Sequence, residues 1–170
     1  MKMTIISSLD QLAPDLQTQF AHVIKESWRK IYINLGTYTA AYETDDSFWG
    51  LPMIEKELGA GNRWLLALED GHCIAAVLLE ATADGLMLRM LGVHPDHQGR
   101  SLGTAIIQQA EEIARTEGYA KLTLFTTGLL TGLVTFYKRI GFTETRREPV
   151  SRFGLHYDRV FFEKILNSPV

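Results

Sequence analysis

Apolar positions recur at two spacings along the chain, and the change of spacing separates a helical first part from a later part that alternates strands and helices. Residues 12–33 predict an amphipathic helix with Pro14 in its first turn, because apolar residues return there every three or four positions. Those positions are Leu16, Phe20, Val23, Ile24, Trp28 and Ile31. Residues 47–58 predict a second, shorter helix that ends before Gly59.

From residue 63 the spacing changes to that of strands. Residues 63–81 contain two short apolar runs around Glu69-Asp70-Gly71, which predicts an antiparallel hairpin. Residues 85–95 predict a third strand, which is entered through Asp84-Gly85 and stopped by Pro95. The first half of the chain therefore ends in a three-stranded antiparallel meander.

The remaining residues alternate helix and strand. Residues 101–117 predict a helix that ends at Gly118, with Gln108, Glu111, Glu112 and Arg115 largely on its polar face. A strand at 120–126 and a helix at 131–140, ended by Gly141, follow. Residues 156–166 predict the last strand, and the polar stretch 147–159 before it is interpreted as a loop. This order predicts an α/β fold in which helices cover both faces of a mixed sheet.

Composition and charge narrow the functional classes. A chain of 170 residues with 46% hydrophobic and 22% charged residues predicts a single domain over 1–170. A net charge of −3 disfavours nucleic acid as the main partner, while small anions remain open. No segment has the length and apolarity of a signal peptide core or a membrane span, so we expect a cytoplasmic protein without a membrane partner. Cys73 is interpreted as a buried, inert thiol.

The stretch HQGRSLGTAII, residues 97–107, carries the clearest candidate chemistry. Unpaired main-chain N–H groups at a helix start attract an anion, and small residues let a diphosphate approach the backbone. Arg100 would add a cationic fork, and Ser101 fits a helix N-cap with a hydroxyl donor. The alternative is an ordinary tight turn. The stretch lacks the Gly-Lys-Ser/Thr ending of a P-loop and the position of a dinucleotide fingerprint.

The same residues resemble a known family. LGVHPDHQGRSLGTAII is similar to the acyl-CoA-binding motif of the GNAT N-acetyltransferase superfamily, and FYKRIGF, residues 136–142, resembles its later motif. The resemblance covers roughly residues 63–165 and implies a central mixed sheet of about six or seven strands. It implies acetyl-CoA as acyl donor and an amine of a small molecule or a peptide N-terminus as acceptor; it leaves a homodimer open. The implied coenzyme-binding residues are Leu91, Val93, Gln98, Gly99, Arg100, Ser101, Gly103 and Thr104.

One departure from the family pattern is Ser101, which stands at its first glycine. A serine is tolerated there if its backbone is already helical, because only a positive φ demands glycine. The resemblance also implies that Tyr137 is the general acid that protonates the departing thiolate. Tyr137 falls on the apolar stripe of its predicted helix, so the alternative is a plain core residue.

The general base is left open. Where some family members place a strand glutamate, this chain has Met87, so Glu80, His94 or a water chain are the alternatives. No cluster of Cys, His and Asp has metal-site spacing, and we expect no metal.

The acceptor is expected between the N-terminal helices, where aromatic and acidic residues suit a cationic amine. These candidates are Trp28, Tyr32, Tyr38, Tyr42, Glu43, Asp45, Asp46 and Trp49. The alternative is that the tryptophans are core and the acidic run is a solvated connector. A competing function for the whole chain is an acyl-CoA-binding module without turnover, which Ser101, Met87, Leu130 and Leu133 keep open as departures from the pattern.

Overall fold

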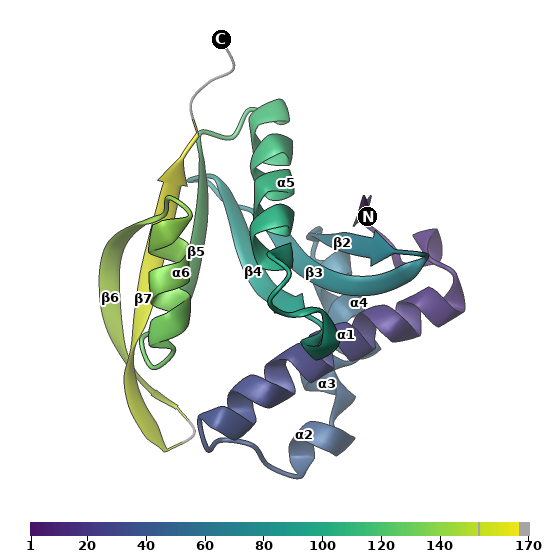
Figure 1. Cartoon of the computed structure of the whole chain (residues 1–170), viewed down its shortest axis with the longest axis horizontal. Helices are drawn as coiled ribbons and strands as arrows, with labels where there is room; N and C mark the ends of the chain where they lie inside the picture. The colour runs from purple at the N-terminus through teal and green to yellow at the C-terminus, as the bar shows by residue number, and fades with distance from the viewer. Residues whose placement is uncertain (153, 167–170) are drawn as a thin grey trace. The chain divides into compact units, whose positions relative to one another are not determined.

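A computed structural model describes residues 1–152 and 154–166, apart from the side chains of residues 46 and 47. Its strands form one seven-stranded sheet in the order β1-β2-β3-β4-β5-β7-β6 (Figure 1). Pairing is antiparallel for β1–β2, β2–β3, β5–β7 and β6–β7 and parallel for β4–β5, so the mixed sheet predicted above is confirmed. The strands are β1 Lys2–Ile6, β2 Arg63–Glu69, β3 His72–Ala81, β4 Leu86–Val93, β5 Lys121–Thr127, β6 Thr143–Arg152 and β7 Leu155–Ile165.

The helices follow the predicted order with one subdivision and one addition, the short helix α2, which lies in a stretch interpreted as a connector. They are α1 Pro14–Asn34, α2 Ala41–Thr44, α3 Asp46–Trp49, α4 Leu51–Gly59, α5 Leu102–Thr116 and α6 Thr131–Arg139, with short 3-10 turns at Leu9–Gln11 and Pro95–His97. The single helix predicted for 47–58 is wrong, because Gly50 is extended between α3 and α4. Within the described residues, no helix combines the length and apolarity needed to cross a membrane.

Contacts divide the chain into two compact units, residues 1–80 with 90–110 and residues 81–89 with 111–170. The prediction of a single domain over 1–170 stays a prediction. Each unit has its own buried residues.

The first unit packs helices against both faces of its strands. On one face, Trp64 of β2 lies edge-on to Phe20 of α1, with ring centroids 5.0 Å apart, and both side chains are fully buried. Successive strand residues point to opposite faces, so Leu65 faces the other way, and it is also fully buried. The same unit contains the first half of α5, whose Ile106 is fully buried. This agrees with the prediction of helices on both faces.

In the second unit, a partly buried ion pair joins α5, the end of α6 and β7. Lys164 of β7 donates to the carboxylate of Glu111 and, at 2.9 Å, to the carbonyl of Ile140 after α6. Glu111 also accepts from Arg115 at 3.3 Å. Glu111 was expected on the solvent face of its helix, and its burial corrects that expectation: the Lys164 ammonium compensates the buried carboxylate.

Two strands lie outside the predictions. The N-terminal strand β1 was not predicted, and it pairs with β2 in register from Lys2↔Leu68 to Ile6↔Trp64. The polar stretch 147–159, interpreted as a loop, instead supplies most of the β6–β7 hairpin. Most β6 side chains are exposed, so the polar composition reflects an edge strand with few buried positions.

The local turn chemistry agrees with the sequence. Asp70 and Gly71 both have positive φ, 50° and 81°, as a two-residue hairpin turn of the primed type requires. Gly118 and Gly141, with φ of 83° and 100°, end α5 and α6 in left-handed conformations.

Helix α1 approaches the end of β4 very closely at Gly92. A Cβ atom added to Gly92 would lie 2.4 Å from Ser27 Oγ and 3.3 Å from Ser27 Cβ. Ser27 is buried, and its hydroxyl donates to the carbonyl of Ile24 at 3.0 Å. Only glycine at position 92 therefore permits this distance between helix and strand.

Replacing Gly92→Ala is expected to lower the unfolding free energy by about 1–3 kcal/mol, because the new methyl overlaps Ser27. Adding Ser27→Ala removes the closest atom and should recover part of the loss. Urea unfolding of the wild type, both single variants and the double variant measures this coupling. Additive losses in the double variant would contradict the assigned contact.

Candidate active site

Strand β4 leaves its pairing with β5 early. Among the described residues, the β4–β5 register consists of Leu86↔Leu122 and Met87↔Thr123. Three residues later, Met90 has a left-handed φ of 52° inside the strand. A non-glycine residue in this region costs on the order of 1–2 kcal/mol, and it interrupts regular strand geometry. Leu91 and Val93, implied as coenzyme contacts, both lie after this kink.

Gln98 ties the following turn back to β4. Its Nε2 donates to the Val93 carbonyl at 3.2 Å, and its Oε1 accepts from Lys30 Nζ at 3.4 Å. Both ends of the Gln98 amide are therefore used within the protein.

The entry to α5 contains two left-handed residues. Gly99 has a φ of 80° and Ser101 a φ of 58°, and the Ser101 carbonyl then accepts the first helical hydrogen bond from Ala105 N at 3.0 Å. A left-handed residue followed by a helical one turns consecutive N–H groups to the same side, which is a geometry that binds anions. The N–H groups of Leu102, Gly103 and Thr104 have no acceptor inside the helix by their position in its first turn.

The backbone of Ser101 differs from the expected helical conformation. Serine was expected to replace the family's glycine on a helical backbone, yet its φ is positive. An ordinary N-cap residue is extended, so the predicted N-cap geometry is absent as well. Ser101 thus keeps the backbone conformation that glycine usually supplies, at the cost of steric strain.

The Arg100 guanidinium binds a carboxylate of the protein. Its Nη1 and Nη2 donate to Glu69 Oε2 and Oε1 at 3.0 and 2.7 Å, and Nη1 lies 2.8 Å from His97 Nδ1. This pairing lowers the pKa of Glu69, the last residue of β2. The predicted cationic fork is present, but its charge is already compensated.

His94, one of the candidate bases, lies in a row of imidazoles. Its ring centroid is 5.7 Å from that of His22 on α1 and 5.8 Å from that of His97. Its Nδ1 accepts from Asp96 N at 3.2 Å. Partial burial lowers the pKa of His94 below the ordinary 6.5, so its ring is mainly neutral at pH 7 and can accept a proton.

Tyr137 is buried in the second unit, on α6. Its ring lies 5.8 Å, centroid to centroid, from both Phe142 and Phe162, and 5.2 Å from Phe136. Burial raises the pKa of Tyr137 to about 12, so the phenol stays protonated at physiological pH. This environment suits a proton donor and a core residue equally well.

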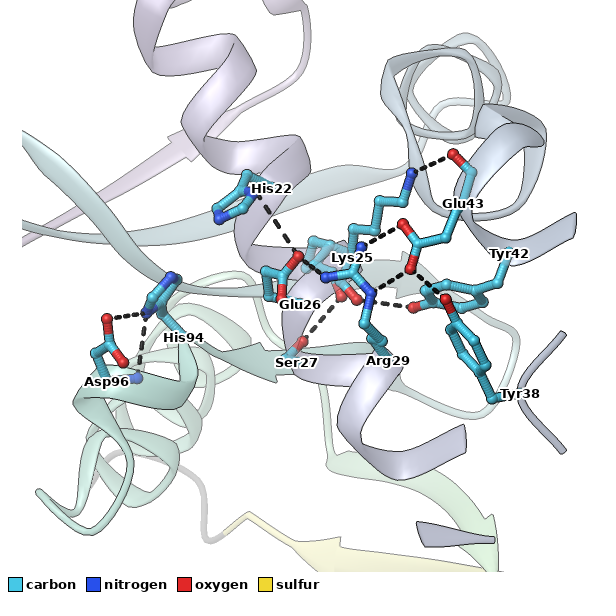
Figure 2. A network of polar contacts seen from close by, with 11 residues as sticks. His22, Lys25, Glu26, Ser27, Arg29, Tyr38, Tyr42, Glu43, His94 and Asp96 are labelled. Carbon is cyan, nitrogen blue, oxygen red and sulfur yellow. Dashed lines mark hydrogen bonds and ion pairs between the residues drawn. The ribbon is translucent and has the colours of Figure 1, made fainter. Parts of the chain in front are cut away.

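Glu43 is the centre of the polar network on the N-terminal helices (Figure 2). Arg29 Nε and Nη2 each donate to its carboxylate at 2.6 Å, and the Tyr38 hydroxyl donates at 2.7 Å. These bonds lower the pKa of Glu43 to about 2. Glu43 therefore serves first as the partner of Arg29, and a cationic acceptor would have to compete for it.

The aromatic candidates form a stack. Trp28 and Trp49 are parallel within 11°, with centroids 5.2 Å apart, and Tyr32 lies edge-on to Tyr42 at 5.4 Å. Trp49 and Tyr42 are buried, which favours the core interpretation for these two, whereas Tyr38 is exposed. The side chain of Asp46 lies outside the described residues.

Several residues of this region were not predicted to matter. Glu69 and Lys30 contact the turn from positions 31 and 68 residues away, and Arg29 pairs with Glu43 across 14 residues. No local motif marks them, because their roles come from the packing of α1 and of the β2–β3 hairpin. In the described part of the chain, no group of three or more His, Cys, Asp and Glu residues is arranged to hold a metal ion.

Comparison with known proteins gives a family match over most of the chain. A model of the acetyltransferase (GNAT) family matches residues 22–142. A curated relative, an uncharacterized N-acetyltransferase of Methanocaldococcus jannaschii, is 42% identical over 52 residues, which cover 31% of this chain and 23% of that protein. The match thus spans about a quarter of that relative's length.

Solved structures show the same fold. The PaiA N-acetyltransferase of Thermoplasma acidophilum in complex with coenzyme A aligns with a TM-score of 0.72 and 20% identity, over 97% of this chain and 99% of that chain. A GNAT family acetyltransferase of Elizabethkingia anophelis with acetyl-CoA bound aligns with a TM-score of 0.59 and 19% identity, over 69% and 84%. At these identities the likeness establishes the fold alone.

The left-handed backbone at Ser101 predicts that Ser101→Gly leaves the protein equally stable or stabilises it by up to about 1 kcal/mol. Gly99→Ala has room for the methyl group but the same positive φ, so it should destabilise by about 1 kcal/mol. Chemical unfolding of both variants measures these shifts. A Ser101→Gly variant clearly less stable than the wild type would show that the side chain, and not the backbone, holds this turn.

Proposed function

The chain belongs to the acetyltransferase (GNAT) family, and on that premise we propose that it is an N-acetyltransferase. It moves an acetyl group from acetyl-CoA to a primary amine of a small molecule or of a peptide N-terminus, by direct attack in a ternary complex. The observation that carries the proposal is the left-handed turn at Gly99 and Ser101, which turns the first N–H groups of α5 outward.

The proposed coenzyme contacts are mainly main-chain groups. The N–H groups of Gly99, Arg100, Ser101, Gly103 and Thr104 bind the diphosphate. The Gln98 N–H already donates to the Pro95 carbonyl at 3.3 Å, so Gln98 contributes by holding the turn through its side-chain bond to Val93. The main chain of Leu91 and Val93 pairs with the pantetheine arm. The short β4–β5 register and the kink at Met90 support this second contact, because they separate these residues from regular pairing with β5.

The reaction itself needs two proton movements. The amine nitrogen attacks the thioester carbonyl carbon, a C–N bond forms, the C–S bond breaks, and the amine loses one proton while the departing sulfur gains one. We assign the proton donor to Tyr137, since its raised pKa keeps the phenol protonated. Holding both reactants in place supplies most of the remaining acceleration.

We propose His94 as the base. Its lowered pKa keeps the ring neutral at pH 7. The strand position where some family members have a glutamate base is Met87 in this chain, and methionine cannot accept a proton. Glu80 and a water chain remain the alternatives. The acceptor amine is proposed to bind near the exposed Tyr38, at the rim of the aromatic stack.

A second candidate is a coenzyme-binding module without turnover. Ser101 in place of a glycine and Met87 in place of a glutamate favour it, because both are departures at positions that the family uses for its chemistry. A screen for acetyl-CoA-dependent thiol release over a panel of amines and peptides separates the two functions. An enzyme releases thiol with at least one acceptor; a binder is stabilised by coenzyme A against heat and releases none.

In the same assay, Tyr137→Phe is expected to lower kcat at least about tenfold while coenzyme affinity stays within about twofold. Tyr119→Phe is the matched control and should retain full activity. Because the Tyr137 pKa is raised to about 12, the acid form persists, and wild-type kcat should not fall between pH 7 and pH 10 through this group. Unchanged turnover in Tyr137→Phe would assign the residue to the core alone.

A further inference from the structure

Two cationic side chains reach the turn that is proposed to bind the coenzyme diphosphate. One is Arg100, which belongs to the turn, and the other is Lys30 of α1, whose Nζ lies 3.4 Å from Gln98 Oε1. Both belong to the first unit. Their chemical situations differ, and the difference determines which positive charge a phosphate group meets.

Arg100 has little charge to offer. Both of its terminal nitrogens bind the Glu69 carboxylate, at 3.0 and 2.7 Å, in the two-pronged arrangement that guanidinium groups favour. A phosphate that approached this guanidinium would also approach the Glu69 carboxylate, which repels it. The pairing fixes the turn to the end of β2, so Arg100 acts as a positioning residue whose main-chain N–H remains available.

Lys30 differs from Arg100 because its hydrogen-bond partner at the turn carries no charge. Its side chain is exposed, and its contact is the neutral amide oxygen of Gln98. An ammonium group has three donors, so two remain for phosphate oxygens. The neighbouring cations of α1 point elsewhere: Arg29 binds the carboxylates of Glu26 and Glu43, and Lys25 donates to the Glu43 carbonyl at 3.1 Å.

The fold brings Lys30 to the turn through the close contact at Gly92. Ser27 touches this glycine, and Lys30 lies three residues further along α1, on the same side of the helix. Gly92 itself is six residues before Gln98. The absence of a Cβ at position 92 thus lets α1 approach the β4–α5 turn closely enough for the Lys30 stem to span the distance.

We propose that Lys30 is a coenzyme-binding residue that supplies the counter-charge for the diphosphate, a role that the sequence motif assigned to the Arg100 side chain. This inference rests on the proposed function. The coenzyme site then contains residues from both α1 and the turn before α5. Coenzyme affinity would thus depend on α1, the helix that also carries candidate residues for the acceptor.

Calorimetric titration of coenzyme A and of dephospho-coenzyme A, which keeps the diphosphate but lacks the 3′-phosphate, tests the assignment. Lys30→Met is expected to weaken both ligands about fivefold, since one partly exposed charge pair is lost. Lys30→Arg should stay within about twofold of the wild type. Lys56→Met on α4 carries the same change of net charge and should bind like the wild type. The double variant Arg100→Gln/Glu69→Gln, which removes both charges of the pair, should lose less affinity than Lys30→Met.

Several results would overturn the assignment. Equal affinity of Lys30→Met and wild type contradicts it, and so does a larger loss in the double variant Arg100→Gln/Glu69→Gln. A loss for coenzyme A without a loss for dephospho-coenzyme A places Lys30 at the 3′-phosphate and contradicts the diphosphate role. If Lys30→Met unfolds, Lys30→Gln replaces it. A folded wild type that gives no heat with either ligand contradicts the proposed function itself, and the assignment falls with it.

Discussion

The left-handed backbone at three positions, one inside β4 and two in the turn before α5, is the constraint on which the rest of the site depends. Met90, Gly99 and Ser101 have φ values of 52°, 80° and 58°, and two of the three are not glycine. Each interrupts a regular hydrogen-bond pattern, first in the strand and then at the start of the helix. Such strain persists only where the surrounding structure holds it. Here Met90 packs against the core of the first unit, and the Gln98 amide binds the Val93 carbonyl.

This backbone conformation orients main-chain N–H groups toward the proposed diphosphate site. The charged side chains nearby mostly pair with one another. Glu69 of β2 neutralises Arg100, and Glu43 neutralises Arg29. These two arginines of the first unit therefore connect neighbouring segments of the protein. In the second unit, Lys164 does the same for Glu111, beside the carbonyl that ends α6. Ion pairs of this kind position the elements, whereas the proposed chemistry relies on N–H groups, a neutral imidazole and a protonated phenol.

The sequence predicted those features that local chemistry determines. Asp70-Gly71 specified a hairpin turn, Gly118 and Gly141 specified helix ends, and periodic apolar residues specified α1, α5 and the strands they cover. The predictions failed where pairing with a distant segment decides the structure. Strand β1 is stabilised by β2, about sixty residues away, and β6 by β7, although its polar composition indicates a loop. The predicted helix over 47–58 failed for a local reason: it ran through Gly50 and Pro52, although a proline in the first turn is itself a signal that a new helix starts there.

The candidate site likewise contains features that follow from local sequence and features that depend on the packing of distant segments. The turn from Gln98 to Thr104 was found from its motif, since glycine positions and a helix start are local features. The conformation of Ser101 was not, because serine gives no sign that its φ is positive. The Glu69 partner of Arg100 and the contact between Lys30 and Gln98 depend on how the β2–β3 hairpin and α1 pack, and neither follows from spacing along the chain.

In the proposed site, the N–H groups at the start of α5 bind the diphosphate of an acyl carrier. Backbone amide resonances of the ¹⁵N-labelled protein, followed by NMR while coenzyme A is added, test it most directly. The largest shifts are expected on residues 99–104, and adenosine without phosphates should leave those resonances in place. No change at residues 99–104 on saturation with coenzyme A would contradict it.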